Sequence, residues 1–167
     1  MTARLQMPTV SRSETSTMKS ERTFATFRVA GDSLVPDQLT KLLGIHPTLA
    51  YAKGEHYSRG PRSRDLRGRT GVWFLSTDDE VQSNSLADHI EWLLSQIAPN
   101  QAKLRRFVEQ NSLHAVMTCF WHGPPGARPP IVPRQALDIL EKIPAKLEED
   151  FDTDEQPPLV PVRLQAR

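Results

Sequence analysis

Apolar residues gather in three segments whose pattern predicts β-strands. The segments are 23–30 (TFATFRVA), 70–77 (TGVWFLST) and 113–121 (LHAVMTCFW), all rich in β-branched and aromatic residues. Successive strand residues point to opposite faces, so Phe24 and Arg28 are expected on the face opposite to Phe27. Residues 49–55 predict a weaker strand, and the charged segment 146–151 suits an edge strand.

Four other segments carry apolar residues at the i, i+3, i+4 spacing of an amphipathic helix. They are 36–43, 85–97, 101–110 and 133–143. Pro36 suits the first turn of a helix, and Gly44 supplies the left-handed conformation that ends one. Pro99 interrupts the second helical pattern, and Pro144 ends the last.

The predicted elements follow the order β-α-β-β-α-β, then a helix and a candidate edge strand. This order predicts an α+β fold with a ferredoxin-like core, in which an antiparallel sheet carries helices on one face. Segments 49–55 and 70–77 are expected to form a hairpin with an arginine-rich loop at its tip.

Composition divides the chain into three parts. Residues 21–151 are expected to form a single α/β domain, large enough to bury about two-thirds of its unfolded surface without a disulfide or metal. Residues 1–20 are rich in Ser and Thr, and residues 152–167 are acidic and then proline-rich, so both are predicted to be disordered. Met18 is an alternative candidate for the natural start.

Charge and cysteine content narrow the class of protein. The net charge of +1 gives no overall field that recruits nucleic acid or membranes. The single cysteine excludes an internal disulfide. The chain contains neither a secretory signal pattern nor an apolar run of about 18 residues that could span a membrane. A cytoplasmic location is expected.

Several ordered patches resemble a known family. They are FRVAGDSLVPDQLTKLLGIHPT, AYAKGE, RTGVWFLST, ADHIEWLLSQIAP and AVMTCFW. Together they resemble the uncharacterised bacterial family catalogued as domain of unknown function four-two-seven-nine, over roughly residues 23–151. The resemblance implies a compact α/β domain in a bacterial cytoplasm and brings no activity. The N-terminal extension, the arginine content of 59–69 and the proline-rich segment 123–133 depart from the family pattern.

The common catalytic and metal-binding motifs are absent from the sequence. No glycine-rich phosphate loop, HExxH or CxxC motif occurs, so no cofactor and no metal are predicted. His114 and His122 share a strand face but stand roughly 26 Å apart along an ideal strand, which is too far for one ion. Cys119 lies in mid-strand and is expected to pack in the core.

Two sets of residues remain as candidate sites. The stronger is a cluster of arginines that can contact phosphates or carboxylates bidentately: Arg59, Arg62, Arg64, Arg67 and Arg69. Such a loop can also be merely solvated, or pair with the acidic segment 148–155. The second set is His89 and Trp92, which border the apolar stripe of one helix. They could line a pocket or seal the edge of a core.

Three hypotheses follow for the function. The leading one is a small non-enzymatic interaction module that binds a protein partner. The second is binding of a nucleic acid or another polyanion through Arg59 to Arg69, with Tyr51 and Tyr57 as stacking candidates. The third is an enzyme with an unrecognised site around His89, Trp92 or His114. The oligomeric state is not predicted.

Overall fold

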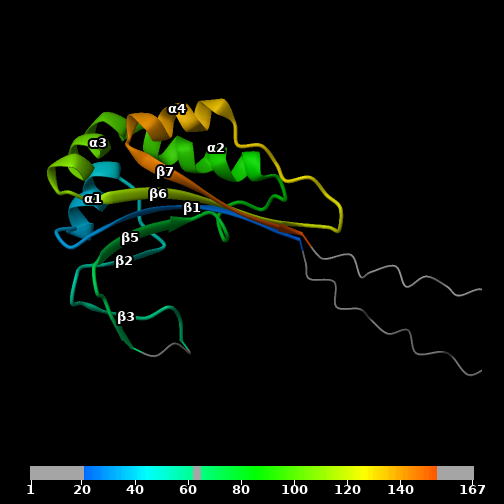
Figure 1. The fold of residues 1–167 in the computed structure, drawn as a ribbon. Coiled ribbons are helices and arrows are strands. Elements are labelled where there is room, and N and C mark those ends of the chain that lie inside the picture. Colours follow the sequence, from blue (N-terminus) through cyan, green and yellow to red (C-terminus); the bar gives the residue numbers. More distant parts are fainter. Residues whose placement is uncertain (1–20, 62–64, 154–167) are drawn as a thin grey trace, which may run out of the picture.

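The computed structural model of the protein describes residues 21–61 and 65–153 (Figure 1). The predictions for residues 1–20 and 154–167, and those for Arg62 and Arg64, lie outside the described residues.

A five-stranded sheet forms the centre of the fold. Its strands are β1 (Arg22–Gly31), β2 (Leu49–Tyr51), β5 (Gly71–Ser76), β6 (His114–Gly123) and β7 (Ala145–Thr153). They lie in the order β2-β5-β1-β6-β7. Neighbouring strands are antiparallel, except that β6 and β7 run parallel. Two short strands, β3 (His56–Tyr57) and β4 (Leu66–Arg67), form a separate ribbon between β2 and β5.

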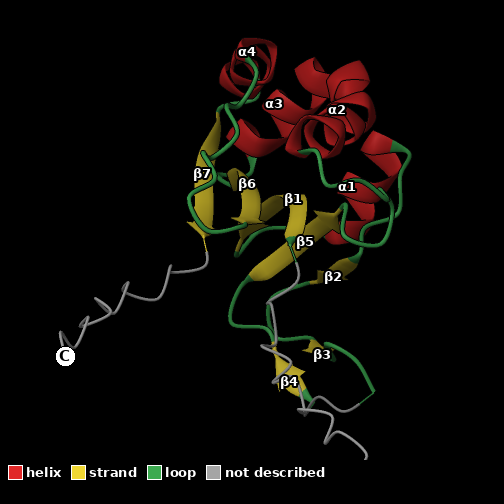
Figure 2. Cartoon of the chain, turned by 90° about the vertical axis from the view of Figure 1, so that its right-hand side faces the viewer, coloured by secondary structure: helices red, strands yellow, loops and turns green. Residues whose placement is uncertain are grey.

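Helices cover one face of the sheet. They are α1 (Pro36–Leu43), α2 (Leu86–Ile97), α3 (Gln101–Gln110) and α4 (Arg134–Lys142), with a 3-10 turn η1 (Ala98–Asn100) between α2 and α3. Figure 2 shows the helices on one side of the sheet and the β3–β4 ribbon projecting on the other. The second face of the sheet is therefore not covered by a described helix, and we call it the open face.

The apolar side chains that face the helices form the core. Phe27 of β1, Trp73 of β5 and Met117 of β6 are fully buried there, together with Leu39 of α1 and Leu93 of α2. The Trp73 indole N–H donates a hydrogen bond to Thr40 Oγ1 of α1, at 3.1 Å. This bond satisfies the only polar atom of the largest buried side chain.

Most predicted elements are confirmed, and one is shorter than expected. The mixed α and β class is confirmed, with a mostly antiparallel sheet. The hairpin between 49–55 and 70–77 is confirmed, but β2 ends at Tyr51. The backbone turns there because Glu55 accepts a hydrogen bond from the Ala52 N–H at 2.7 Å and Gly54 has a φ of 84°. The predicted edge strand is β7, which continues to Thr153, two residues past the expected end of the domain.

Candidate binding groove on the open sheet face

The open face carries aromatic and arginine side chains from several strands. On β1, Arg22, Phe24 and Arg28 point away from the core, because buried Ala25, Phe27 and Val29 alternate with them. The strand register places Phe74 of β5 beside Arg28, and Phe120 of β6 beside Phe24. The rings of Phe24 and Phe120 stack with centroids 4.3 Å apart. The open face is thus a partly apolar surface that also carries cations.

A groove of about 680 Å³ is lined by residues of this face and by residues 58–60, which follow β3. Two guanidinium groups, Arg28 and Arg59, line it together with apolar and aromatic side chains. The other lining residues come from β2, β5 and the segment before residue 62: Thr48, Leu49, Tyr51, Ser58, Gly60, Val72 and Phe74. We call this feature the arginine groove.

Tyr51, which lines the arginine groove, stacks on a second tyrosine from the ribbon. Tyr51 of β2 and Tyr57 of β3 lie with ring centroids 3.9 Å apart and planes within 9°. Burial raises the pKa of Tyr51, and the neighbouring Tyr57 hydroxyl adds to this effect. The positive charges of Arg59 and Arg28 act on the Tyr51 pKa in the opposite direction, so both guanidiniums are close enough to influence the phenol. A ligand anion in the groove would experience the same two charges.

The Arg28 side chain is available to a ligand. It is exposed, and within residues 21–61 and 65–153 the structure shows no ion pair or hydrogen bond of its guanidinium. Arg22 differs, because its guanidinium donates to Asp78 at 2.5 Å and lies over the Phe24 ring. Asp78 and Phe24 therefore already engage Arg22. Arg28 lines the groove and also borders the neighbouring hollow that contains Glu148 and Asp150.

The predicted arginine cluster is only partly brought together. Arg59 lines the arginine groove. Arg67 lies on β4, where its Nε–H donates to the Gly54 carbonyl at 3.0 Å and braces the ribbon. Arg69 is exposed, and neither Arg67 nor Arg69 pairs with the described acidic residues 148–153. The sequence did not single out Arg28, whose only signal is a charged residue at an outward position of an otherwise apolar strand.

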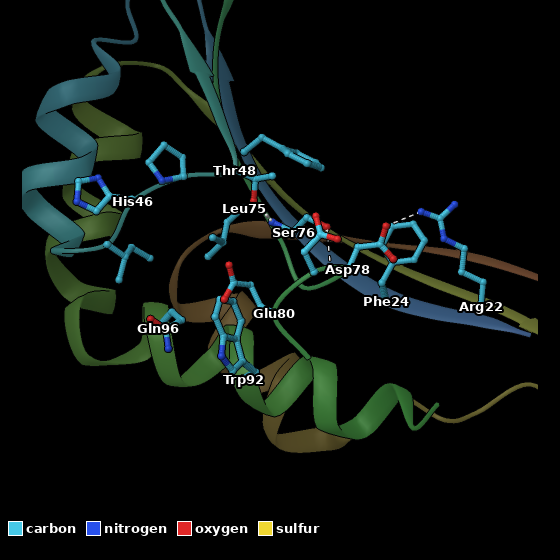
Figure 3. A pocket seen from close by; sticks show the side chains of 14 residues that line it. Arg22, Phe24, His46, Thr48, Leu75, Ser76, Asp78, Glu80, Trp92 and Gln96 are labelled. Carbon is cyan, nitrogen blue, oxygen red and sulfur yellow. Dashed lines mark hydrogen bonds and ion pairs between the residues drawn. The ribbon is translucent and has the colours of Figure 1, made fainter. Parts of the chain in front are cut away.

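His89 and Trp92 lie on one helix but have different surroundings. His89 is 1% exposed; its Nε2–H donates to the Ser83 carbonyl at 2.8 Å, and its Nδ1 lies 2.6 Å from Thr77 Oγ1. Trp92 instead lines a cavity of about 610 Å³ with His46, Glu80 and Gln96. Figure 3 shows Trp92 and Gln96 projecting from α2 into this cavity. Neither residue contributes to the arginine groove.

The comparison with known families gives one finding. The family described as Domain of unknown function (DUF4279) matches residues 20–154. The chain belongs to this family. The resemblance carried by the ordered sequence patches is therefore confirmed. We found no match among curated proteins and none among solved structures.

The match to DUF4279 includes the whole sheet, from β1 to β7. All residues that line the arginine groove lie inside the matched region. The groove is thus part of the DUF4279 domain of this chain and does not belong to its terminal segments.

The described part of this DUF4279 chain has no grouping of three or more His, Cys, Asp or Glu side chains that could hold a metal ion. Among the same residues, no helix is long and apolar enough to cross a membrane.

Cys119 is buried on the core face of β6, as expected from its position. Burial, with a smaller contribution from Glu149, raises the pKa of Cys119 to about 12. A thiol with this pKa stays protonated at about pH 8, and only the thiolate is nucleophilic. We expect iodoacetamide to leave Cys119 unmodified in the folded protein at this pH and to modify it in denaturant, as measured by mass spectrometry. Equal modification rates in the two states would contradict the buried placement.

Proposed function

We propose that this protein is a non-enzymatic interaction module that binds an acidic segment of a protein partner in the arginine groove. One observation carries the proposal: Arg28 and Arg59 line a groove together with the half-buried side chains of Tyr51, Val72 and Phe74. The groove can therefore hold a carboxylate and an apolar side chain from the same short segment.

The guanidinium groups supply the recognition of charge. A guanidinium offers planar, paired N–H donors that match a carboxylate, and a hydrogen bond to a charged group contributes about 1.5–3 kcal/mol. Tyr51 and Phe74 are half-buried, so a ligand side chain that covers them removes more apolar surface from water. Charge and apolar contact together favour an acidic peptide over a simple anion.

Single-stranded nucleic acid is the second candidate. Phe24, Phe74 and Phe120 on the open face offer rings on which bases could stack, which favours this ligand. The carboxylates of β7 oppose it, because Glu148 and Asp150 line a hollow of about 440 Å³ together with Arg28, Phe74 and Phe120. A phosphate backbone that lay across the sheet would meet these negative charges. A short acidic segment that stays within the arginine groove meets these charges only where Arg28 borders both cavities, so we favour the protein partner.

A charge-reversal experiment tests the proposal. Arg28→Glu should weaken binding of an acidic peptide by about tenfold or more, because a donor of charged hydrogen bonds becomes a repelling carboxylate. The probes are labelled peptides of about nine residues that combine Glu or Asp with Phe or Leu at varied spacings, read by fluorescence anisotropy. A single-stranded oligonucleotide of similar length and charge is titrated in parallel.

The matched control is Arg106→Glu on α3. Arg106 is exposed and lies on a helix of the covered face, and the substitution changes the net charge by the same amount. Its affinity for the peptides should equal that of the unchanged protein. Equal peptide affinities of the Arg28 and Arg106 variants would contradict binding in the arginine groove. The same conclusion would follow if none of the peptides bound. Tighter binding of the oligonucleotide, also lost on Arg28→Glu, would support the second candidate.

We also propose that the first six predicted elements form a ferredoxin-like core. The order β2-β5-β1-β6 with antiparallel neighbours supports this assignment, and β7 is then an addition to the core beyond β6. A location in a bacterial cytoplasm stays a prediction.

A further inference from the structure

Strand β7 forms one edge of the five-stranded sheet. It spans nine residues and pairs with β6 along its whole length, from Ala145 beside Ala115 to Thr153 beside Gly123. No other strand of the described chain pairs with it, so its second edge carries backbone N–H and C=O groups without a strand partner there (Figure 2). Such an edge can accept an additional strand.

The side chains of β7 give this edge a strong negative charge. Glu148, Asp150 and Asp152 follow each other at every second position and therefore point to the open face. Glu149 points to the other face, and the one basic residue of the strand is Lys146. All four carboxylates are exposed.

Few of these charges are balanced within the described part of the protein. His122 Nδ1 lies 3.9 Å from Asp152, and Thr118 donates to Glu148 at 3.4 Å. Glu149 and Asp150 have no ion pair with a described residue. The edge thus combines a row of negative charges with backbone groups that can pair with another strand.

The charges select the kind of strand that can be added. In a self-paired edge, the β7 strand of a second copy would bring carboxylates against carboxylates, and like charges directly opposite each other are destabilising. A strand with Lys or Arg at every second position would place its cations beside Glu148, Asp150 and Asp152, because both strands have the same period of two. The remaining positions of that strand would face the helix side.

On the helix side of β7, the added strand would meet apolar side chains, so its positions on that side should also be apolar. Leu147 and Phe151 are half-buried there, and Phe151 packs edge-on against Trp121 at 6.3 Å. An apolar side chain next to each would remove more of their surface from water. The two faces of β7 therefore define a pattern in which basic and apolar residues alternate.

We infer that β7 is a docking strand for an extended partner segment in which basic residues alternate with apolar ones. The segment adds to the sheet as a sixth strand, with backbone hydrogen bonds along the edge and its cations over the open face. This site takes a ligand of opposite charge to that of the arginine groove. The two sites adjoin each other, because Arg28 and Phe74 line both the groove and the hollow beside Glu148 and Asp150.

The test uses a labelled peptide of about seven residues that alternates Lys and Val. A second peptide of the same composition, with the lysines grouped at one end, is the control for charge alone. The alternating peptide should bind more tightly in fluorescence anisotropy and should slow amide hydrogen exchange in residues 145–153. Equal binding of the two peptides, or unchanged exchange in β7, would overturn the inference.

Variants of the full chain locate the binding. Glu148→Lys with Asp150→Lys should weaken the alternating peptide by about tenfold, since two favourable cross-strand pairs become repulsive. Asp37→Lys with Glu91→Lys makes the same change of charge at exposed positions of α1 and α2, and should leave the affinity unchanged. If both double variants lose affinity for the alternating peptide to a similar extent, the binding depends only on overall charge, and the inference of a docking strand is wrong.

One competitor lies in the chain itself. Residues 162–167 have the sequence VRLQAR, in which apolar residues alternate with basic or polar ones. The double variant Arg163→Glu with Arg167→Glu should bind the alternating peptide with the same affinity as the unchanged protein. If the peptide binds only to that variant, the edge is taken by the protein's own C-terminal residues, and the inference of an external partner is wrong.

Discussion

Replacing Trp73 by alanine should lower the free energy of unfolding by about 3–5 kcal/mol, the range for large aromatic residues truncated in a core. Trp73 is 0% exposed and lies at the centre of β5, facing the helices. Its indole packs in the core cluster and its N–H bonds to Thr40 Oγ1. The substitution removes this contact and leaves a cavity. Urea unfolding followed by circular dichroism measures the loss.

Trp73→Phe separates packing from the hydrogen bond. Phenylalanine fills much of the same space but leaves Thr40 Oγ1 without the indole donor, so we expect a loss of about 1–2 kcal/mol. Trp92→Phe on α2 is the matched control, because Trp92 is only half-buried at the edge of a cavity. A loss at Trp73→Ala no greater than that at Trp92→Phe would contradict the placement of Trp73 in the core.

The second large effect is expected at the buried hydrogen-bond network of His89. Thr77 Oγ1 accepts from the Ala25 N–H at 2.9 Å, lies 3.1 Å from the Ala25 carbonyl and contacts His89 Nδ1. His89 in turn donates to Ser83, so the network joins β1, the end of β5 and the loop before α2. His89→Leu should cost about 2–4 kcal/mol, because buried polar groups lose their partners.

A double-mutant cycle with Thr77→Val tests the network itself. Thr77→Val alone should cost about 1–3 kcal/mol. The double variant should be less destabilised than the sum of the two single variants by about 1 kcal/mol, since the two side chains share one interaction. Strict additivity in urea unfolding would show that His89 and Thr77 act independently, contrary to the 2.6 Å contact.

The local elements of this fold could be predicted because their signals are local. The alternation around Phe27 and the proline at position 36 depend only on neighbouring residues. The shortened β2 could not be predicted in the same way. Its end depends on the bond from Ala52 to the Glu55 side chain, and four residues of sequence do not reveal which rotamer Glu55 adopts.

The arginine groove depends on contacts between distant segments. The run of arginines in the sequence pointed to Arg59. Arg28 lies in the same groove because β5 pairs with β1 on one side and with β2 on the other, and this strand order is not visible in the sequence. Phe74 and Tyr51 become neighbours of Arg28 through the same sheet order. The position of His89 at the border of an apolar stripe left open a pocket or the edge of a core, and its burial with hydrogen bonds to Thr77 and Ser83 places it in the core. Sheet order and long-range partners are set by tertiary packing, which periodicity does not encode.

Mapping of the peptide contact by nuclear magnetic resonance tests the central proposal most directly. An acidic peptide selected by anisotropy is titrated into the ¹⁵N-labelled full chain. We predict that the largest amide shifts fall on the residues that line the arginine groove: Arg28, Thr48, Leu49, Tyr51, Ser58, Arg59, Gly60, Val72 and Phe74. Amide shifts confined to the helices, or to the residues around the Trp92 cavity, would contradict binding of the acidic peptide in the arginine groove.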